Sequence, residues 1–316
     1  MPASNAIVVI DDVSKRFGNQ RVVDHLCFSV PTGSLFGLIG PNGSGKTTTM
    51  RMILRIYQPD AGHIQVLGKT EGRTADSRIG YLPEERGLYP RMTVRRLLRY
   101  FAALKKVADP EKGIEHWLER LGMTSWAGKR IDQLSKGMAQ KVQFISAVIG
   151  KPQLVILDEP FSGLDPVNLD LLRSAVSELR DAGTTVILST HDMDVAQQMC
   201  DRILMIYRGQ KVLDGTLAEI RQNQGKPRLR VRMSPQSPPP PNDLPGVERV
   251  EAAGDALDLF LADSDYRPAV LRALCAVGDV EHFETVRPSL HDIFVSIAGP
   301  EARENPSASS LASVIP

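Results

Sequence analysis

The stretch that decides the fold reads Gly40-Pro41-Asn42-Gly43-Ser44-Gly45-Lys46-Thr47, directly after the apolar run Leu35-Phe36-Gly37-Leu38-Ile39. It matches the pattern G-x-x-x-x-G-K-[ST], in which backbone N–H groups close around phosphate oxygens. The apolar run predicts a strand, and Met50, Ile53 and Leu54 predict a helix after the loop. Because a helix N-terminus attracts anions, this strand, loop and helix predict a site for a nucleoside triphosphate.

Each polar residue of the loop has an expected role. We expect Lys46 to reach the β and γ phosphates, Thr47 to ligate Mg²⁺ and Thr48 to contact a further phosphate oxygen. The pattern alone does not choose between kinases, GTPases and transport ATPases. The rest of the loop is predicted to surround the phosphates: Gly40, Pro41, Asn42, Gly43, Ser44 and Gly45.

A second apolar run, Leu154-Val155-Ile156-Leu157, ends in Asp158-Glu159. If this run is an interior strand, both carboxylates lie at its carboxyl end, where open α/β sheets bind ligands. Asp158 is then placed for the Mg²⁺ shell, and Glu159 is placed to polarise an attacking water.

The bulk composition bounds the remaining choices. The chain has 316 residues, enough for about two domains, and Lys+Arg 38 against Asp+Glu 37 gives a net charge of +1. This balance gives no global electrostatic reason to expect nucleic acid as a partner. We expect the widely spaced Cys27, Cys200 and Cys275 to be small buried residues in a reducing compartment. No secretion signal and no apolar run of membrane-spanning length is found, so we expect neither secretion nor a membrane span.

The pattern along the chain predicts two domains. Short β-branched runs alternate with amphipathic stretches from Ile7 to about Thr216, which indicates an α/β domain, and Thr185 to Ser189 is a third interior strand. Between Thr93 and Gly137 the apolar residues recur at helical spacing, which predicts a helical insertion.

After Ile220 the composition changes, which predicts a second, smaller domain. Its Pro-rich segment 235–241 cannot lie in a sheet interior, so we expect a loop there. Ser289 with Asp292 is a plausible helix start, and the tail 300–316 is expected to be disordered. The expected strands are 229–233, 247–252, 257–262 and 280–286, and the expected helices are 268–276 and 290–298.

With Leu134-Ser135-Lys136-Gly137-Met138, these motifs resemble the nucleotide-binding subunits of ATP-binding-cassette (ABC) transporters, in the expected order over residues 7–216. The resemblance implies an α/β P-loop NTPase cassette with a mainly parallel core sheet, antiparallel N-terminal strands and a helical insertion at about 84–140. It also implies ATP and Mg²⁺ as cofactors. The cassette is expected to span residues 1–222, followed by a small α+β domain at 223–299.

The same resemblance implies further site residues. Ser135 and Gly137 are expected to contact the γ-phosphate bound by a partner copy, although Lys136 and Met138 depart from the commoner L-S-G-G-Q sequence. Phe17 is expected to stack on adenine. Asp165 is expected in a loop that passes between subunits, and His191 at the γ-phosphate as a catalytic residue.

A further departure is Glu84, because the family usually has glutamine where this residue stands. In the family that residue contacts Mg²⁺ and water and relays the nucleotide state to the helical insertion. A carboxylate is a good ligand for a hard cation, so we expect Glu84 to keep the metal and catalytic roles. The alternative is a solvated loop residue with a weakened relay.

The resemblance also implies partners: a homodimer or paired ATPase subunit that shares its ATP sites, and a separate membrane permease. The expected place is the cytoplasmic face of the cell membrane, as a peripheral subunit. The C-terminal domain, ending in Ser289-Leu290-His291-Asp292-Ile293-Phe294, resembles that of sodium-extrusion and multidrug exporters, which favours export. Two alternatives stay open: a soluble ABC ATPase acting on ribosomes or nucleic acid, and a module that binds ATP without turnover.

Overall fold

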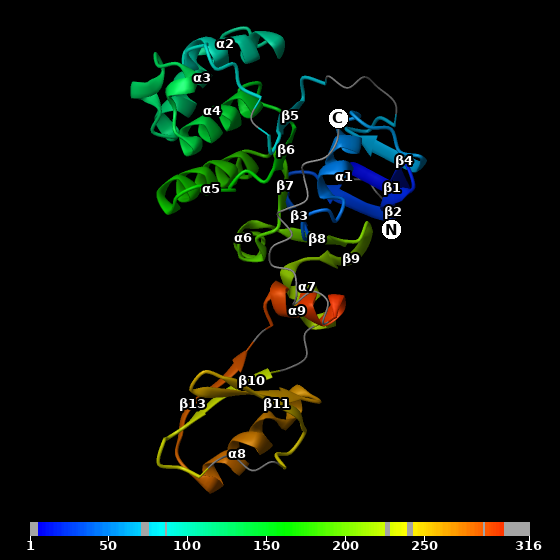
Figure 1. The fold of residues 1–316 in the computed structure, drawn as a ribbon, viewed down its shortest axis with the longest axis vertical. Coiled ribbons are helices and arrows are strands. Elements are labelled where there is room, and N and C mark those ends of the chain that lie inside the picture. Colours follow the sequence, from blue (N-terminus) through cyan, green and yellow to red (C-terminus); the bar gives the residue numbers. More distant parts are fainter. Residues whose placement is uncertain are drawn as a thin grey trace. The chain divides into compact units, whose positions relative to one another are not determined.

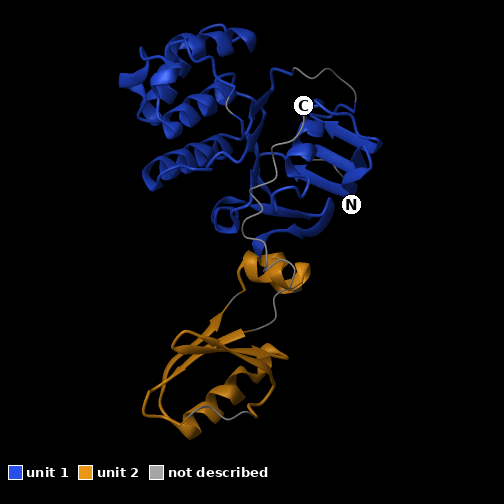
Figure 2. Ribbon diagram, viewed as in Figure 1, with its two compact units in different colours: residues 1–217 blue, residues 218–316 orange. Residues whose placement is uncertain are grey.

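The computed structural model describes residues 6–70, 76–85, 87–224, 228–238, 243–286 and 288–299. The chain forms two compact units, Met1–Leu217 and Ala218–Pro316, which Figure 2 colours separately. The predicted disordered tail 300–316 lies outside the described residues, as does 239–241 of the Pro-rich segment.

The first unit is built on a six-stranded sheet in the order β5-β6-β7-β3-β8-β9 (Figure 1). Neighbouring strands are parallel except β8 and β9, which are antiparallel. Three interior strands are buried along their whole length, as their unbroken apolar runs predicted. The strands are β3 (Leu35–Ile39), β5 (Ile79–Leu82), β6 (Leu154–Asp158), β7 (Thr185–Thr190), β8 (Arg202–Tyr207) and β9 (Gln210–Gly215).

Helices follow the strands of this sheet. The helix α1 (Lys46–Ile53) begins inside the phosphate loop, directly after β3, as the sequence predicted. The helix α5 (Pro166–Asp181) joins β6 to β7, and α6 (Met193–Met199) joins β7 to β8. The phosphate loop and the end of β6 therefore lie at the same carboxyl edge of the sheet, since β6, β7 and β3 are parallel neighbours.

A second, antiparallel sheet has the order β2-β1-β4 and contains β1 (Ala6–Phe17), β2 (Gln20–Pro31) and β4 (Ala61–Val66). Burial alternates along β2, and Cys27 falls on an exposed position of that alternation. The expectation of buried cysteines was therefore wrong for Cys27 and also for Cys275, which are both exposed free thiols; Cys200 is half-buried.

The predicted helical insertion is present, and its apolar residues share one hydrophobic core with residues of the central sheet. Val94, Leu97 and Leu98 are fully buried, together with Ile114. Leu104 continues the same helical spacing of apolar residues, but it is 59% exposed because it is the last residue of its helix. The elements are α2 (Val94–Leu104), α3 (Glu111–Arg120), the 3₁₀ turns Thr124–Trp126 and Ile131–Gln133, and α4 (Lys136–Val148).

The second unit contains a four-stranded antiparallel sheet in the order β11-β12-β10-β13. The predicted strands and helices of this part are confirmed to within a residue at most ends, and Ser289 forms the predicted capping box with Asp292. One face packs on α8 through buried residues such as Leu259 and Leu274. The elements are α7 (Leu217–Gln224), β10 (Arg228–Met233), β11 (Val247–Ala253), β12 (Ala256–Leu261), the 3₁₀ turn Ser264–Tyr266, α8 (Arg267–Val277), β13 (Val280–Val286) and α9 (Leu290–Ala298).

Among the described residues, no helix has the length and apolar character needed to cross a membrane.

Candidate nucleotide site

The phosphate loop needs glycine at two positions because of both its backbone angles and the space around it. Gly40 has φ +148° and Gly45 has φ +109°, values that L side chains rarely adopt. A Cβ at Gly40 would lie 2.1 Å from the carbonyl oxygen of Ile206, and one at Gly45 would lie 2.7 Å from that of Val22. The loop is therefore pressed against its neighbours, and only glycine lets the backbone follow this path.

Lys46 lies inside this loop and is only 6% exposed. Its Nζ donates to the carbonyl oxygens of Gly40 at 2.8 Å and Pro41 at 3.2 Å, and it lies 4.0 Å from Oε1 of Glu159. Burial lowers the pKa of Lys46, whereas the carboxylates of Glu159, Asp158 and Glu84 act in the opposite direction. An ammonium group held among loop carbonyls can exchange those acceptors for phosphate oxygens of higher charge.

Asp158 ends β6 and is 1% exposed. Its Oδ1 accepts from Ser189 Oγ at 2.6 Å and from Thr47 Oγ1 at 3.5 Å, while its Oδ2 is buried with no hydrogen-bond partner among the described residues. A buried carboxylate oxygen without a donor is costly unless a cation or donor meets it. The structure thus brings together two of the three predicted metal ligands, Thr47 and Asp158, and they fit Mg²⁺, which usually binds one or two protein groups plus phosphates and water.

Glu159 follows Asp158 in the chain, and three contacts with Ser189 and His191 hold it in place. Its N–H meets the carbonyl oxygen of Ser189 at 3.3 Å and the Ser189 hydroxyl at 3.1 Å, and its Oε1 lies 2.9 Å from Nδ1 of His191. Burial raises the pKa of Glu159, outweighing the lowering by His191 and Lys46. Its backbone has φ +48°. A carboxylate with a raised pKa and a histidine partner is suited to act as a general base.

Ser189 contacts both acidic residues, through the carboxylate of Asp158 and the backbone N–H of Glu159, a role that was not predicted from the sequence. A serine at the end of a buried apolar strand carries no motif of its own. Only the parallel pairing of β6 with β7, which places Asp158 opposite Ser189, reveals it.

Ser135 and Gly137 belong to a second group of side chains at the N-terminus of α4. The Ser135 hydroxyl caps this helix by accepting from the N–H of Met138 at 3.3 Å. A Cβ at Gly137 would lie 3.3 Å from Nδ2 of Asn168, and that same amide donates to Asp165 at 2.5 Å. Hydrogen bonds from Asn168 lower the pKa of Asp165. The predicted residues Ser135, Gly137 and Asp165 are therefore brought together through Asn168, which no sequence motif had singled out.

This second group is not joined to the first. Ser135 and Asp165 are exposed, and no hydrogen bond or ion pair in the described part of the chain connects them to Lys46 or Glu159. Lys136 is exposed too, with its Nζ close to Gly163, where an added Cβ would approach it to 2.7 Å. The structure thus presents two separate groups of predicted site residues.

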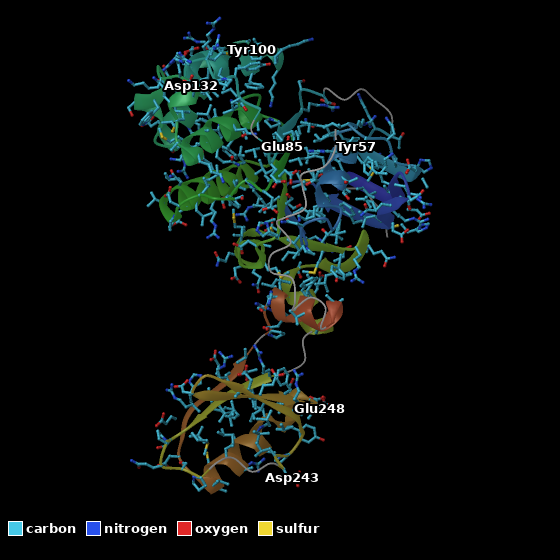
Figure 3. All side chains as sticks on the ribbon, in the orientation of Figure 1. Tyr57, Glu85, Tyr100, Asp132, Asp243 and Glu248 are labelled. Carbon is cyan, nitrogen blue, oxygen red and sulfur yellow. The ribbon has the colours of Figure 1, made fainter. Side chains whose placement is uncertain are left out.

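Phe17, Thr48 and Glu84 lie outside these two groups. Phe17 is 44% exposed, and its ring meets Tyr57, labelled in Figure 3, edge to face at a centroid distance of 5.3 Å. Thr48 is half-buried in the first turn of α1, and Glu84 is exposed after β5. The Phe17 ring also has Lys15 Nζ over it, 5.7 Å from its centroid, and its exposed part offers aromatic surface on which a base can stack.

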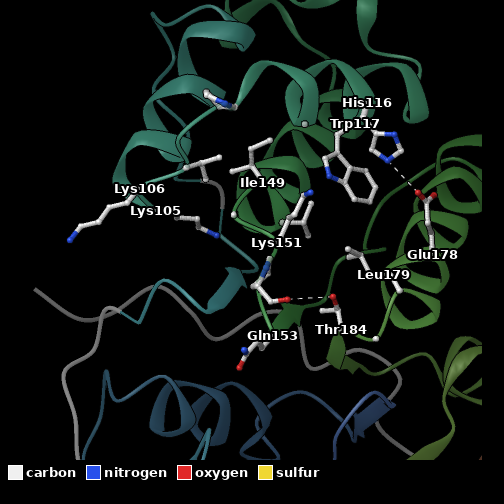
Figure 4. A pocket seen from close by; sticks show the side chains of 18 of the residues that line it. Lys105, Lys106, His116, Trp117, Ile149, Lys151, Gln153, Glu178, Leu179 and Thr184 are labelled. Atoms are coloured by element: carbon white, nitrogen blue, oxygen red, sulfur yellow. Dashed lines mark hydrogen bonds and ion pairs between the residues drawn. The ribbon is translucent and has the colours of Figure 1, made fainter.

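A cavity of about 1230 Å³ lies elsewhere in the same unit, as Figure 4 shows. It is lined by Gln153 and Thr184, which directly precede β6 and β7, and by Trp117 and Lys105 of the helical part. It therefore lies at the amino ends of the strands whose carboxyl ends carry Asp158 and Thr190. This cavity shares no residue with the phosphate loop.

Family profiles and relatives that match this chain include ABC transporter ATP-binding proteins. The profile of the ABC transporter family matches residues 23–162, and the profile described as the C-terminal domain of DrrA1-3-like ATP-binding proteins matches residues 215–298. The uncharacterized ABC transporter ATP-binding protein YhaQ of Bacillus subtilis (strain 168) is 41% identical over 301 residues, covering 93% of this chain and 99% of its own. Nod factor export ATP-binding protein I of Rhizobium sp. (strain N33) is 35% identical over 312 residues, covering 94% and 99%.

A solved structure agrees with these sequence matches. The ATP-binding subunit of an ABC transporter superposes with a TM-score of 0.65 at 31% sequence identity, covering 69% of this chain and 93% of that one.

Proposed function

The chain belongs to the family of ABC transporter ATP-binding subunits, which hydrolyse ATP to power transport, and we propose that two copies of it close around two ATP molecules. The observation that carries this proposal is the separation of the two groups of site residues. One group holds Lys46 and Glu159, and the other presents Ser135 at an exposed helix N-terminus. Each group is half of a site, and a second copy supplies what the first lacks.

The exposed group has the chemistry to receive a phosphate. The helix α4 begins directly after its cap Ser135, and its N-terminal N–H groups and the positive end of its dipole favour an anion. Next to it, Val167 in the first turn of α5 is 70% exposed, beside Asp165. The helix N-terminus, rather than this single apolar side chain, is what supports a phosphate contact there.

Within the buried group, the chain's own residues divide the work of hydrolysis. Lys46 holds the β and γ phosphates, and Glu159 accepts a proton from the attacking water while His191 holds its carboxylate in place. Thr47 and Asp158 would hold Mg²⁺, whose charge offsets that of the phosphates. We propose that Glu84, exposed just after β5, approaches this site on closure, because a carboxylate is a good ligand for a hard cation.

Coupling to transport needs a surface for a separate membrane permease, and we place it on the helical part beside the Glu84 loop. Tyr89 and Tyr100 are 47% and 37% exposed there, and their rings meet edge to face at 5.6 Å (Figure 3 labels Tyr100). Paired exposed aromatic side chains are typical of protein interfaces. Docking at this surface would hold the chain at the cytoplasmic face of the membrane.

Export is the direction that the relatives support. Several are Nod factor export ATP-binding proteins, and they match over nearly the whole chain, including the C-terminal unit. Because these relatives are transporter subunits, they give no support to the alternative of a ribosome- or nucleic-acid-associated ATPase.

The test of turnover compares phosphate release by the wild type and Glu159→Gln. We expect the rate to fall by a factor on the order of 10²–10⁴, since general-base catalysis contributes that much. ATP binding, measured by equilibrium dialysis, should persist in the variant. Equal residual rates would show that Glu159 carries no chemistry and would overturn the proposed mechanism.

The test of pairing uses the same variant, which keeps ATP unhydrolysed. Sedimentation of Glu159→Gln with saturating ATP should show a dimer, and with ADP a monomer, because only the γ-phosphate joins the two groups. A monomer that demonstrably holds ATP would contradict the two-copy site.

A further inference from the structure

The loop that carries Glu84 is fixed by a side chain that no motif identifies. Gln143 of α4 is 3% exposed, and its Nε2 donates to the carbonyl oxygens of Pro83 at 3.1 Å and Glu85 at 3.2 Å. These two carbonyls flank Glu84 on either side. One buried amide therefore fixes the backbone on both sides of the residue expected to sense the nucleotide.

The orientation of this amide follows from its surroundings. Both neighbours are carbonyl oxygens, so the NH₂ group must face them, and both of its donors are used. The remaining atom, Oε1, is buried without a hydrogen-bond partner among the described residues. An unpartnered buried acceptor costs free energy that an apolar side chain would not. The two donors to the Glu84 loop offset this cost and explain a glutamine here.

The helix α4 is held against the ends of two strands. A Cβ at Gly80 in β5 would lie 2.4 Å from the carbonyl oxygen of Ala147, so α4 packs directly on β5. One turn earlier stands Gln143, at the loop after β5. Nearer the N-terminus, Gln140 is 4% exposed and donates to the carbonyl oxygen of Pro160, just beyond Glu159. At its start, α4 presents Ser135.

We propose that Gln143 is a positioning residue that fastens Glu84 to the helix carrying Ser135 and Gly137. When a partner's ATP docks on the N-terminus of α4, the helix and the Glu84 loop then move as one body, so closure on one nucleotide sets Glu84 at the other. This inference rests on the two-copy site proposed above, and it assigns the link to two specific hydrogen bonds.

A double-mutant cycle tests this link. The four proteins are the wild type, Gln143→Leu, Glu84→Ala and the double variant, and kcat and KM for ATP are measured for each. Gln143→Leu should lower kcat roughly tenfold, as expected for two lost hydrogen bonds, with KM within about twofold. In the Glu84→Ala background the same change should lower kcat by less than about twofold, because the residue it positions is gone.

The control is Ser146→Ala on the same buried helix. Ser146 Oγ donates to the carbonyl oxygen of Gln143 at 2.7 Å and has no hydrogen bond to the described residues of the Glu84 loop. It should leave kcat unchanged. If Gln143→Leu does not fold, as judged by its melting curve, Gln143→Asn replaces it; its amide is one methylene shorter and cannot reach both carbonyls.

Additive effects in the cycle, or an equal loss in Ser146→Ala, would overturn the positioning role. If Glu159→Gln hydrolysed ATP at the wild-type rate, the proposed function would instead be overturned. The two failures are therefore distinguishable.

Discussion

The two halves of the proposed ATP site contrast sharply in burial. Lys46, Asp158 and Glu159 are 6%, 1% and 8% exposed, whereas Ser135 and Asp165 lie at the surface. The buried half is assembled by the central sheet, through Ser189 and the pairing of β6 with β7. The exposed half is assembled by two helix N-termini that share Asn168. In the two-copy site proposed above, the fold of one copy completes binding and the second copy completes catalysis.

Within the exposed half, the largest expected effect separates capping from catalysis at Ser135. Aspartate caps a helix as well as serine does, so Ser135→Asp should keep the melting temperature of the wild type. Its negative charge faces the partner's phosphates, however, and should lower ATPase turnover about a hundredfold. ATP affinity of the isolated copy, measured at low protein concentration, should not change. A parallel loss of affinity would mean that Ser135 acts within its own copy.

In the buried half, substitution is expected to weaken ATP binding itself. Lys46→Ala removes the charge-assisted hydrogen bonds to phosphate and should weaken ATP binding by roughly thirtyfold. Titration by isothermal calorimetry measures this directly. Lys136→Ala is the matched control, because that lysine is exposed and lies over Gly163, and its affinity should stay within about twofold of the wild type.

The pH dependence of turnover reports on the burial of Glu159. The ionised carboxylate is the active form, and burial raises its pKa, so protonation removes the base at a higher pH than for an ordinary glutamate. Below that pKa, kcat should fall about tenfold per pH unit. Single-turnover rates across the acid pH range measure this fall in rate. The residual rate of Glu159→Gln should not show the same fall. An acid limb shared by both proteins would assign the ionisation elsewhere.

The smallest expected effect lies outside both halves. Phe17→Ala removes an exposed ring from the adenine side and should weaken ATP binding about fivefold, as expected for one aromatic contact. Phe17→Tyr keeps the π-face and should bind like the wild type. If Phe17→Ala bound ATP as tightly as the wild type does, the adenine base would have to stack elsewhere.

Features encoded by neighbouring residues could be predicted from the sequence. The phosphate loop is one, and the helix after Ser289 is another, because its capping box spans only to Asp292. The fold class, the interior strands and the helical insertion followed from apolar periodicity and motif order.

Features that depend on which helices and strands become neighbours could not be predicted from the sequence. Ser189 meets Asp158 only through the register of β6 and β7, and Gln143 meets the Glu84 loop only because α4 packs on β5. The exposure of Cys27 followed from the alternation of β2, which composition alone does not show.

The backbone of Glu159 has an implication for protein engineering. Its φ of +48° is one that glycine or asparagine adopts with less strain, and its side chain is an acid whose burial disfavours the charged form. Glycine at position 159 would relieve both penalties at neutral pH. A library screened for heat resistance alone would therefore enrich substitutions of Glu159, and the enriched variants would have lost ATPase activity. Any search for a more robust variant of this chain needs activity in the same screen.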